Sequence, residues 1–332
     1  MQPITASIPG PAPVLTVMVL VPLAGALLLW FVPPLRGLAR GVGLVFSLGA
    51  LGVGIWAMAL FDPGSGGTVQ LAETRPWIPT LGISWALGVN ALGLAMLLLA
   101  AFLVPLVLLA GWGEIPAEHQ ALFTALVLAL EAFVVVIFSA RDVFLFYVCF
   151  EAMLVPVYVL IGRFGGPDRQ RAALKFLLYS LAGGLVMLVG VVALFFYGPR
   201  TETGYLIGSL AGSLSAPPAA ARWIFASFMI AFAIKAPLVP LHTWLPDTAE
   251  QATPGTSVLL IGVLDKIGTY GMIALVLPLF PEAAAWAAPV VLVLAVVGII
   301  YGGLAAIGQD SLYRLISYTS ISHFGFMVLG IF

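Results

Sequence analysis

Residues 222–272 read RWIFASFMIAFAIKAPLVPLHTWLPDTAEQATPGTSVLLIGVLDKIGTYGM, and this stretch decides the fold of the chain. An apolar run that carries Lys235 is interrupted by Pro237 and Pro240, and a second apolar run carries Lys266. Placing an ammonium group in hydrocarbon costs at least about 2.5–3.5 kcal/mol on insertion scales. Two such lysines beside a helix break therefore indicate that these groups have a function inside a membrane, and we interpret that function as proton transfer.

The composition places the whole chain in a lipid bilayer. Of its 332 residues, 62% are hydrophobic and only 8% are charged, and several apolar runs are long enough to cross about 30 Å of hydrocarbon. The net charge of −1 leaves no basic surface for nucleic acid. A single cysteine, Cys149, excludes a disulfide framework and an iron–sulfur cluster held by this chain alone. Motifs for binding nucleotides do not occur.

The apolar runs predict an all-α, polytopic bundle of about ten membrane-spanning helices, with loops on the outer face at 62–84 and 198–221. The distribution of lysine and arginine favours an N-terminus outside the cell. The predicted spans are 13–33, 41–61, 85–112, 120–139, 143–162, 170–197, 222–246, 256–280, 286–307 and 312–332.

Ionisable residues at membrane depth are few, and each is a candidate for function because lipid does not tolerate an exposed charge. They are Glu131, Glu151, Lys235, Asp265, Lys266 and His323. The chain has three lysines against ten arginines, and two of those lysines lie mid-span. A buried lysine can release its proton whereas an arginine cannot, so this choice favours a proton relay.

Each candidate also has a purely structural interpretation. Glu151 and Lys235 could form a static ion pair between helices, and Asp265 could only compensate the charge of Lys266. His323, near Ser320 and Ser322, could be a satisfied core histidine instead of a proton carrier. For Glu131 the two interpretations are balanced. Lys175, the third lysine, lies in the first turns of its helix and is expected to extend its ammonium to the membrane interface.

The helix break has chemical consequences. Pro237 and Pro240 each remove a backbone donor and clash with the preceding turn, so freed carbonyl groups need other partners. Lys235 lies at the carboxyl end of the first half-helix, where the helix dipole favours its charged form. His242 begins the second half. Broken helices of this kind build ion sites in transporters, although a proline kink without any site is the plain alternative.

Three segments resemble a known family. FAIKAPLVPLHTWLPDTAEQATPGTSVLLIGVLDKIGTYG (232–271) is similar to the proton-conducting antiporter-like family shared by respiratory complex I, membrane-bound hydrogenases and multisubunit cation/proton antiporters. FYVCFEAMLVPVYVLIGRFG (146–165) resembles the glutamate-bearing fifth helix of the family's subunit M branch in complex I, which includes mitochondrial subunit 4. RLISYTSISHFGFMVLGI (314–331) is similar to the later serine–histidine helix. The resemblance covers most of 120–332.

By position, the resemblance implies roles for four residues. Glu151 matches the glutamate that pairs with the lysine of the broken seventh helix, here Lys235. Lys266 matches the lysine of the central relay, and His323 the relay histidine further along. The family also implies about fourteen helices in two inverted repeats, so that further helices are expected beyond Phe332.

The implied domains are N-terminal helices at 1–119, a first repeat with the broken helix at 120–280, and the start of a second repeat at 281–332. No cofactor is expected in this chain. FMN, iron–sulfur clusters and quinone would belong to partner subunits, and the expected neighbours are the antiporter-like subunits L and N, small membrane subunits and the lipid bilayer.

The implied function is proton translocation coupled to NADH oxidation and quinone reduction, in a bacterial plasma membrane. The sequence departs from the family pattern where Thr248 and Ala249 follow HTWLPD, at Asp265, and in Ser311–Tyr313 before the last helix. The rival interpretations are a subunit of a cation/proton antiporter, a membrane hydrogenase arm, an inert scaffold and a transporter of small solutes.

Overall fold

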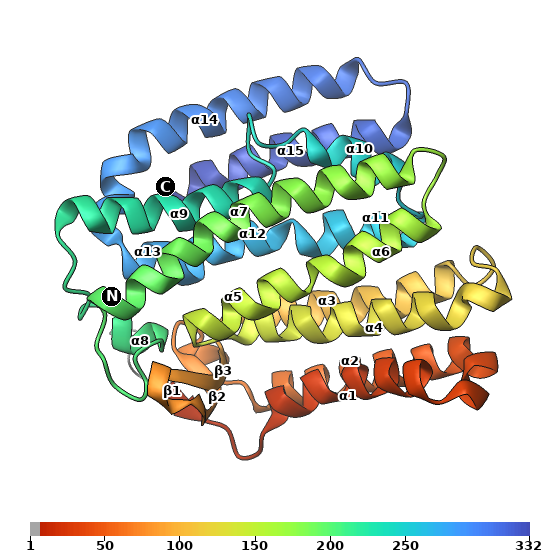
Figure 1. The fold of residues 1–332 in the computed structure, drawn as a ribbon, viewed down its shortest axis with the longest axis horizontal. Helices are drawn as coiled ribbons and strands as arrows, with labels where there is room; N and C mark the ends of the chain where they lie inside the picture. The colour runs from red at the N-terminus through yellow and green to blue at the C-terminus, as the bar shows by residue number, and fades with distance from the viewer. Residues whose placement is uncertain (1–6) are drawn as a thin grey trace. The chain divides into compact units, whose positions relative to one another are not determined.

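The computed structural model describes residues 7–332, and it is mostly helical (Figure 1). Nine helical segments within these residues are long and apolar enough to cross a membrane. This confirms the predicted polytopic bundle. A further long helix, α15 (Leu312–Ile331), is not among the nine, since it carries Arg314 and several serine, threonine and histidine residues that lower its hydropathy.

The nine candidate spans consist of the following elements. They are α1 (Val14–Phe31), η1 with α2 (Pro33–Leu38, Ala39–Leu60), α3 (Ala91–Ala110), α4 (Ala117–Ser139), α5 with α6 (Val143–Ala152, Leu154–Phe164), α7 (Arg169–Tyr197), α9 (Pro218–Lys235), the segment from α11 to α13 (Pro254–Leu279), and α14 (Pro281–Ile307). The short elements are η2 (Pro63–Ser65), η3 (Pro79–Leu81), α8 (Ile207–Leu210) and α10 (Trp244–Gln251).

A small sheet occupies the segment that the sequence predicted as a loop at 62–84. Strand β2 (Val69–Ile78) pairs with β3 (Ile83–Val89) in antiparallel register and with β1 (Ser7–Pro9) in parallel. The prediction of a plain loop at 62–84 is therefore wrong, and the following helix begins at Ala91, not at 85. The sheet also supports the first span, because the Glu73 carboxylate accepts hydrogen bonds from the backbone N–H groups of Leu15 and Thr16 and so caps the start of α1.

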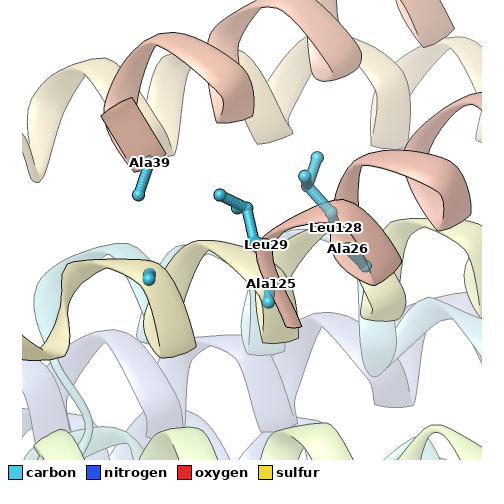
Figure 2. Packing of buried hydrophobic residues seen from close by; sticks show 6 residues of the cluster. Ala26, Leu29, Ala39, Ala125 and Leu128 are labelled. Atoms are coloured by element: carbon cyan, nitrogen blue, oxygen red, sulfur yellow. The ribbon is translucent and has the colours of Figure 1, made fainter. Parts of the chain in front are cut away.

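The chain forms two compact units. The first contains the described residues up to Leu160, together with Arg200–Ser209 and Pro254–Leu259. Its centre is α4, the most buried of the nine candidate spans, which packs against α1, α2, α3 and α5. Figure 2 shows one apolar cluster of this unit, in which Ala125 and Leu128 of α4 meet Ala26 and Leu29 of α1.

The second unit contains Ile161–Pro199, Leu210–Thr253 and Leu260–Phe332. Within it, α9 packs against α7, α14 packs against α15, and α10 contacts both α7 and α15. Helix α14 buries only a small share of its apolar surface within the chain. Such a face suits lipid or a protein partner better than water.

The span predicted at 143–162 is interrupted in the structure. Helix α5 ends at Ala152, and α6 begins at Leu154. Pro156 accounts for this break, because it lacks an N–H donor for the carbonyl of Ala152 and its ring would clash with that carbonyl. As a result, Glu151 lies at the carboxyl end of α5 and not in a continuous helix.

Candidate functional site

The predicted helix break is confirmed. Helix α9 ends at Lys235, and α10 begins only at Trp244. Pro237 and Pro240 lie in the connecting segment, and the carbonyl groups left at the end of α9 find substitute donors. The Leu238 N–H donates to the carbonyl of Ala233 over 2.9 Å, and the Trp244 indole donates to that of Ile234 over 2.9 Å. The second half-helix is thus anchored to the end of the first.

Lys235 is buried at the end of α9, with only 1% of its surface exposed. Its Nζ atom lies over the ring of Phe176 in α7, 5.1 Å from the ring centroid. The same ring packs against Trp244, with centroids 5.4 Å apart. A cation over an aromatic face is stabilised electrostatically. The site therefore holds an ammonium group without the full cost of burying an isolated charge.

Helix α12 (Lys266–Gly271) approaches the end of α9 very closely. A Cβ atom at Gly268 would lie 2.6 Å from the Ala236 nitrogen and 2.6 Å from the Phe232 carbonyl oxygen. Only glycine permits two backbones to come this near. This contact brings the residues at the start of α12 beside Lys235.

Asp265 joins the two lysines of the site. Its side chain is completely buried, and its carboxylate oxygens accept no hydrogen bond within residues 7–332. It interacts electrostatically with both Lys235 and Lys266. The sequence left open whether Asp265 only compensates Lys266, and the structure shows that it also acts on Lys235. One carboxyl group and two amino groups therefore interact with one another at the broken helix.

The backbone around Asp265 is irregular in a way that serves the site. A π-helical segment, Leu260–Leu264, precedes it, and the Asp265 N–H donates to the Leu260 carbonyl. The Lys266 ammonium donates to the Ile261 carbonyl over 3.1 Å. A second π-helical segment follows at Met272–Val276. Single π turns are frequent at functional sites, because they redirect side chains without ending the helix.

His242 lies between the two half-helices and is buried. Its ring packs edge-on against Tyr301 of α14 and Tyr318 of α15, with centroids 4.9 Å and 6.4 Å apart. Neither ring nitrogen has a hydrogen-bond partner within residues 7–332. The candidate histidine thus connects the break to α14 and α15 through aromatic contacts.

A charged cluster that sequence reasoning missed fixes the second half-helix. Asp247 of α10 accepts from Lys175 of α7 over 2.6 Å and from Arg314 of α15 over 2.9 Å. Arg314 also donates to Glu250 over 3.1 Å. A polar cavity of ≈ 240 Å³ lies among these residues. Lys175 is therefore not a free interfacial lysine but half of an ion pair.

The cluster changes the acidity of its central carboxylate. Partial burial raises the pKa of Asp247, but the hydrogen bonds and positive charges of Lys175 and Arg314 outweigh burial, so that the pKa lies below its ordinary value. Asp247 is thus ionised at neutral pH. The partners of Asp247 are 72 and 67 residues away in the chain, so no local pattern could have identified the cluster.

The remaining residues that the sequence predicted for the site, Glu151, His323 and Glu131, lie in other helices. Glu151 is half-buried and belongs to the first unit, whereas Lys235, Asp265 and Lys266 belong to the second. His323 lies on the exposed face of α15. Glu131 is 1% exposed, in the middle of α4. Among residues 7–332, no three His, Cys, Asp or Glu side chains come together in a way that could hold a metal ion.

Comparison with known proteins gives a consistent assignment. A family described as "NADH:quinone oxidoreductase/Mrp antiporter, TM" matches residues 140–332. NADH-quinone oxidoreductase subunit M of Mycobacterium tuberculosis is 44% identical, over 96% of this chain and 64% of the relative. NAD(P)H-quinone oxidoreductase chain 4 2 of Thermosynechococcus vestitus is 39% identical, over 96% of this chain and 59% of the relative. The chain thus spans about three fifths of the length of these relatives.

Solved structures agree with the sequence comparisons. A chain of respiratory complex I from Thermus thermophilus with bound NADH superposes with a TM-score of 0.81 at 33% identity, over 96% of this chain and 64% of that chain. A chain of the Mrp complex from Dietzia sp. superposes with a TM-score of 0.82 at 21% identity, over 96% of this chain and 34% of that one. The second likeness concerns the fold alone.

Proposed function

Because the chain belongs to the NADH:quinone oxidoreductase/Mrp antiporter transmembrane family, we propose that it is a proton-translocating membrane subunit of an NADH:quinone oxidoreductase of the complex I type. The observation that carries this proposal is the group of Asp265, Lys235 and Lys266 at the broken helix, in which Asp265 and Lys235 are buried and Lys266 is half-buried. A proton relay needs protonatable groups that influence one another where lipid is excluded.

The mechanism follows from the charges of this group. Lys235 holds a proton while Asp265 stabilises its ammonium. When a change in the surroundings weakens that stabilisation, the proton passes through water to Lys266 and then towards His323. An opposite charge within about 4–6 Å changes a proton affinity by about 1.4–4 kcal/mol. Moving one charge against 100 mV costs about 2.3 kcal/mol. The change in the proton affinity of Lys235 is therefore of the same size as the energy needed to move one proton.

Glu151 is the proposed trigger. The resemblance assigns it to the fifth-helix glutamate that pairs with Lys235, and it lies at the carboxyl end of α5, beside a proline break. This pairing remains a prediction. Replacing Glu151 by glutamine keeps the shape and removes the charge. We expect the Glu151→Gln variant to assemble normally and to pump fewer protons per NADH oxidised. Normal pumping would remove Glu151 from the relay.

The redox chemistry is assigned to other subunits. NADH oxidation by FMN and iron–sulfur clusters, and reduction of quinone, would take place on partners. The membrane neighbours would include the antiporter-like subunits L and N and small membrane subunits. The bacterial relatives suggest a bacterial plasma membrane, and the lysine and arginine distribution suggests an N-terminus on its outer side.

The test of this proposal is purification of the tagged, full-length subunit in mild detergent, with assays of flavin content and NADH-dependent quinone reduction. A large assembly that has both supports the complex I assignment. A smaller assembly without flavin that exchanges sodium ions for protons would contradict it. That result would instead favour the antiporter function that the family's description names.

A further inference from the structure

Helix α4 carries buried polar atoms that the proposed relay does not use. Gln120, Thr124 and Glu131 are each at least nine-tenths buried. The Gln120 Oε1 atom, the Thr124 Oγ1 atom and both carboxylate oxygens of Glu131 have no hydrogen-bond partner within residues 7–332. Native proteins rarely leave buried polar atoms without partners, so each such atom calls for an explanation.

The three residues share one face of the helix. At 100° per residue, positions 124 and 131 lie about 40° and 20° around the helix from position 120. Glu131 is eleven residues beyond Gln120, which corresponds to about 16 Å along the axis. Gln120 lies one turn from the start of α4, next to the exposed residues 112–114 and 116–118. The unpartnered atoms thus mark a polar stripe from an exposed end of α4 to its middle, which the buried, apolar Val127 interrupts between Thr124 and Glu131.

No cation is available to pair with Glu131 in the elements that pack against α4. Helices α1 and α3 and strand β3 carry no charged residue, and α5 carries only Glu151. Arg40, the single charge of α2, lies over the ring of Trp112 at 5.5 Å. Arg36, in η1, donates to the carbonyls of Leu29 and Trp30. A structural ion pair therefore does not explain Glu131.

The neighbouring face of α4 is apolar and is packed against other apolar side chains of the first unit. Ala121, Ala125 and Leu128 pack there against apolar residues of α1 and α2 (Figure 2). Within the polar stripe, Thr124 lies against α2 and α3: a Cβ atom at Gly43 of α2 would overlap the Thr124 methyl group and would lie 3.3 Å from Leu108 of α3. One face of α4 is thus apolar and filled, while the adjacent face carries acceptors that need donors.

We propose that the polar stripe binds a file of water molecules and that Glu131 is a proton-carrying carboxyl group at its inner end. Buried waters typically satisfy two to four polar atoms, as the acceptors along this stripe require. Glu131 would give its acid proton to the adjacent water and take another back, so that only O–H bonds form and break. This inference rests on the proposed function, because a subunit that moves protons gives such a group its use.

Cysteine labelling tests whether the stripe is hydrated. Cys149 is buried and is the only cysteine in the 332-residue sequence, so a Cys149→Ser background leaves an introduced cysteine as the only thiol in this part of the subunit. In the assembled complex, Thr124→Cys is compared with Ala125→Cys, which is equally buried but faces the apolar cluster. The probe is hydroxyethyl methanethiosulfonate, and modification is followed by mass spectrometry. We expect position 124 to react at least tenfold faster, because the reactive thiolate needs water. Equal rates would overturn the water file.

Infrared spectroscopy tests the carboxyl group directly. On transfer from H₂O to D₂O, the complex should show a shifted carbonyl band of a protonated carboxyl group that is lost in Glu131→Gln. The band should persist in Glu118→Gln, a matched control on the same helix with a side chain 77% exposed. We expect Glu131→Gln also to lower proton pumping at least twofold. An unchanged band and unchanged pumping would overturn the inference.

The outcomes separate this inference from the proposed function. If replacing Lys235 stops pumping while Glu131→Gln changes neither the band nor pumping, the relay stands and the α4 site fails. If position 124 is labelled and the band disappears while the Lys235 variant pumps normally, the hydrated α4 site stands and the proposed relay fails.

Discussion

Replacing Gly268 by alanine tests the close contact that brings α12 to the end of α9. The added Cβ atom would lie 2.6 Å from two backbone atoms of α9, the nitrogen of Ala236 and the carbonyl oxygen of Phe232. Ordinary contact begins at 3.4 Å. Since neither neighbour is a flexible side chain, the helices must separate by about 0.8 Å, and Asp265 and Lys266 must move away from Lys235 with them.

The substitution has two opposing effects on the free energy of unfolding. Alanine is favoured over glycine inside a helix by about 1 kcal/mol. Overpacking of a tight contact costs about 1–3 kcal/mol. We therefore expect a net destabilisation of up to about 2 kcal/mol. The effect on function should be larger, because a displacement of about 1 Å in a reacting site can reduce a rate by as much as about a hundredfold.

The assay compares proton uptake by inverted membrane vesicles, per NADH oxidised, between Gly268→Ala and Gly303→Ala. Gly303 lies in α14 with nothing within 4 Å of an added Cβ atom, so its substitution controls for the change in helix propensity. We expect Gly268→Ala to move clearly fewer protons per NADH while Gly303→Ala resembles the unmodified protein. If both variants pump normally, the close packing of α12 on α9 is not needed for the relay.

Two further predictions concern carboxylates outside the spans. Both are tested by amide hydrogen exchange at several pH values, with each rate corrected for the pH dependence of exchange in an unfolded chain. Asp142 accepts N–H bonds from Ser84, Phe144 and Leu145, yet burial raises its pKa to about 6. Its stabilising contribution is therefore complete below about pH 4 and is lost as the pH rises through about 6. We expect the exchange rate of amides near Ser84 to increase over that range, and the Asp142→Asn variant to lose this pH dependence. An exchange rate that does not change with pH in the unmodified protein would contradict the prediction. For Asp247 the pKa is lowered, so its contribution is present above about pH 4 and is lost only below it. Exchange in α10 should thus stay constant between pH 5 and 8, and Asp247→Asn should quicken it only slightly, since these partly exposed ion pairs contribute no more than about 1 kcal/mol.

The sequence predicted the elements that depend on strong local signals. Pro237 and Pro240 ended α9 as expected, because a proline acts on its own turn regardless of the rest of the fold. Pro156 carries the same signal, and it could have predicted the break at Met153. The hairpin of β2 and β3 was missed since β2 contains Glu73, Arg75 and Pro76 and follows a turn-rich segment, a composition typical of loops.

The arrangement of the site depends on contacts that no local pattern contains. Asp265 lies beside Lys235 because α12 approaches α9 closely at Gly268. A π turn before Asp265 also sets its position, and no pattern in the sequence predicts that turn. The cluster around Asp247 joins three helices far apart in the chain. The sequence identified the lysines at membrane depth as chemically costly and placed Asp265 next to Lys266, whereas the interaction of Asp265 with Lys235 depends on the fold.

The most direct test of the relay is the number of protons pumped per NADH oxidised in Lys235→Ala, with Arg222→Ala as the control. Arg222 lies at the exposed start of the same helix, so its loss removes a cation without touching the buried group. Both variants are measured in assembled complexes, with assembly checked on native gels. Our account predicts that Lys235→Ala lowers the ratio of protons to NADH and that Arg222→Ala leaves it unchanged. An unchanged ratio in Lys235→Ala would contradict the relay and favour a subunit that serves only as a scaffold.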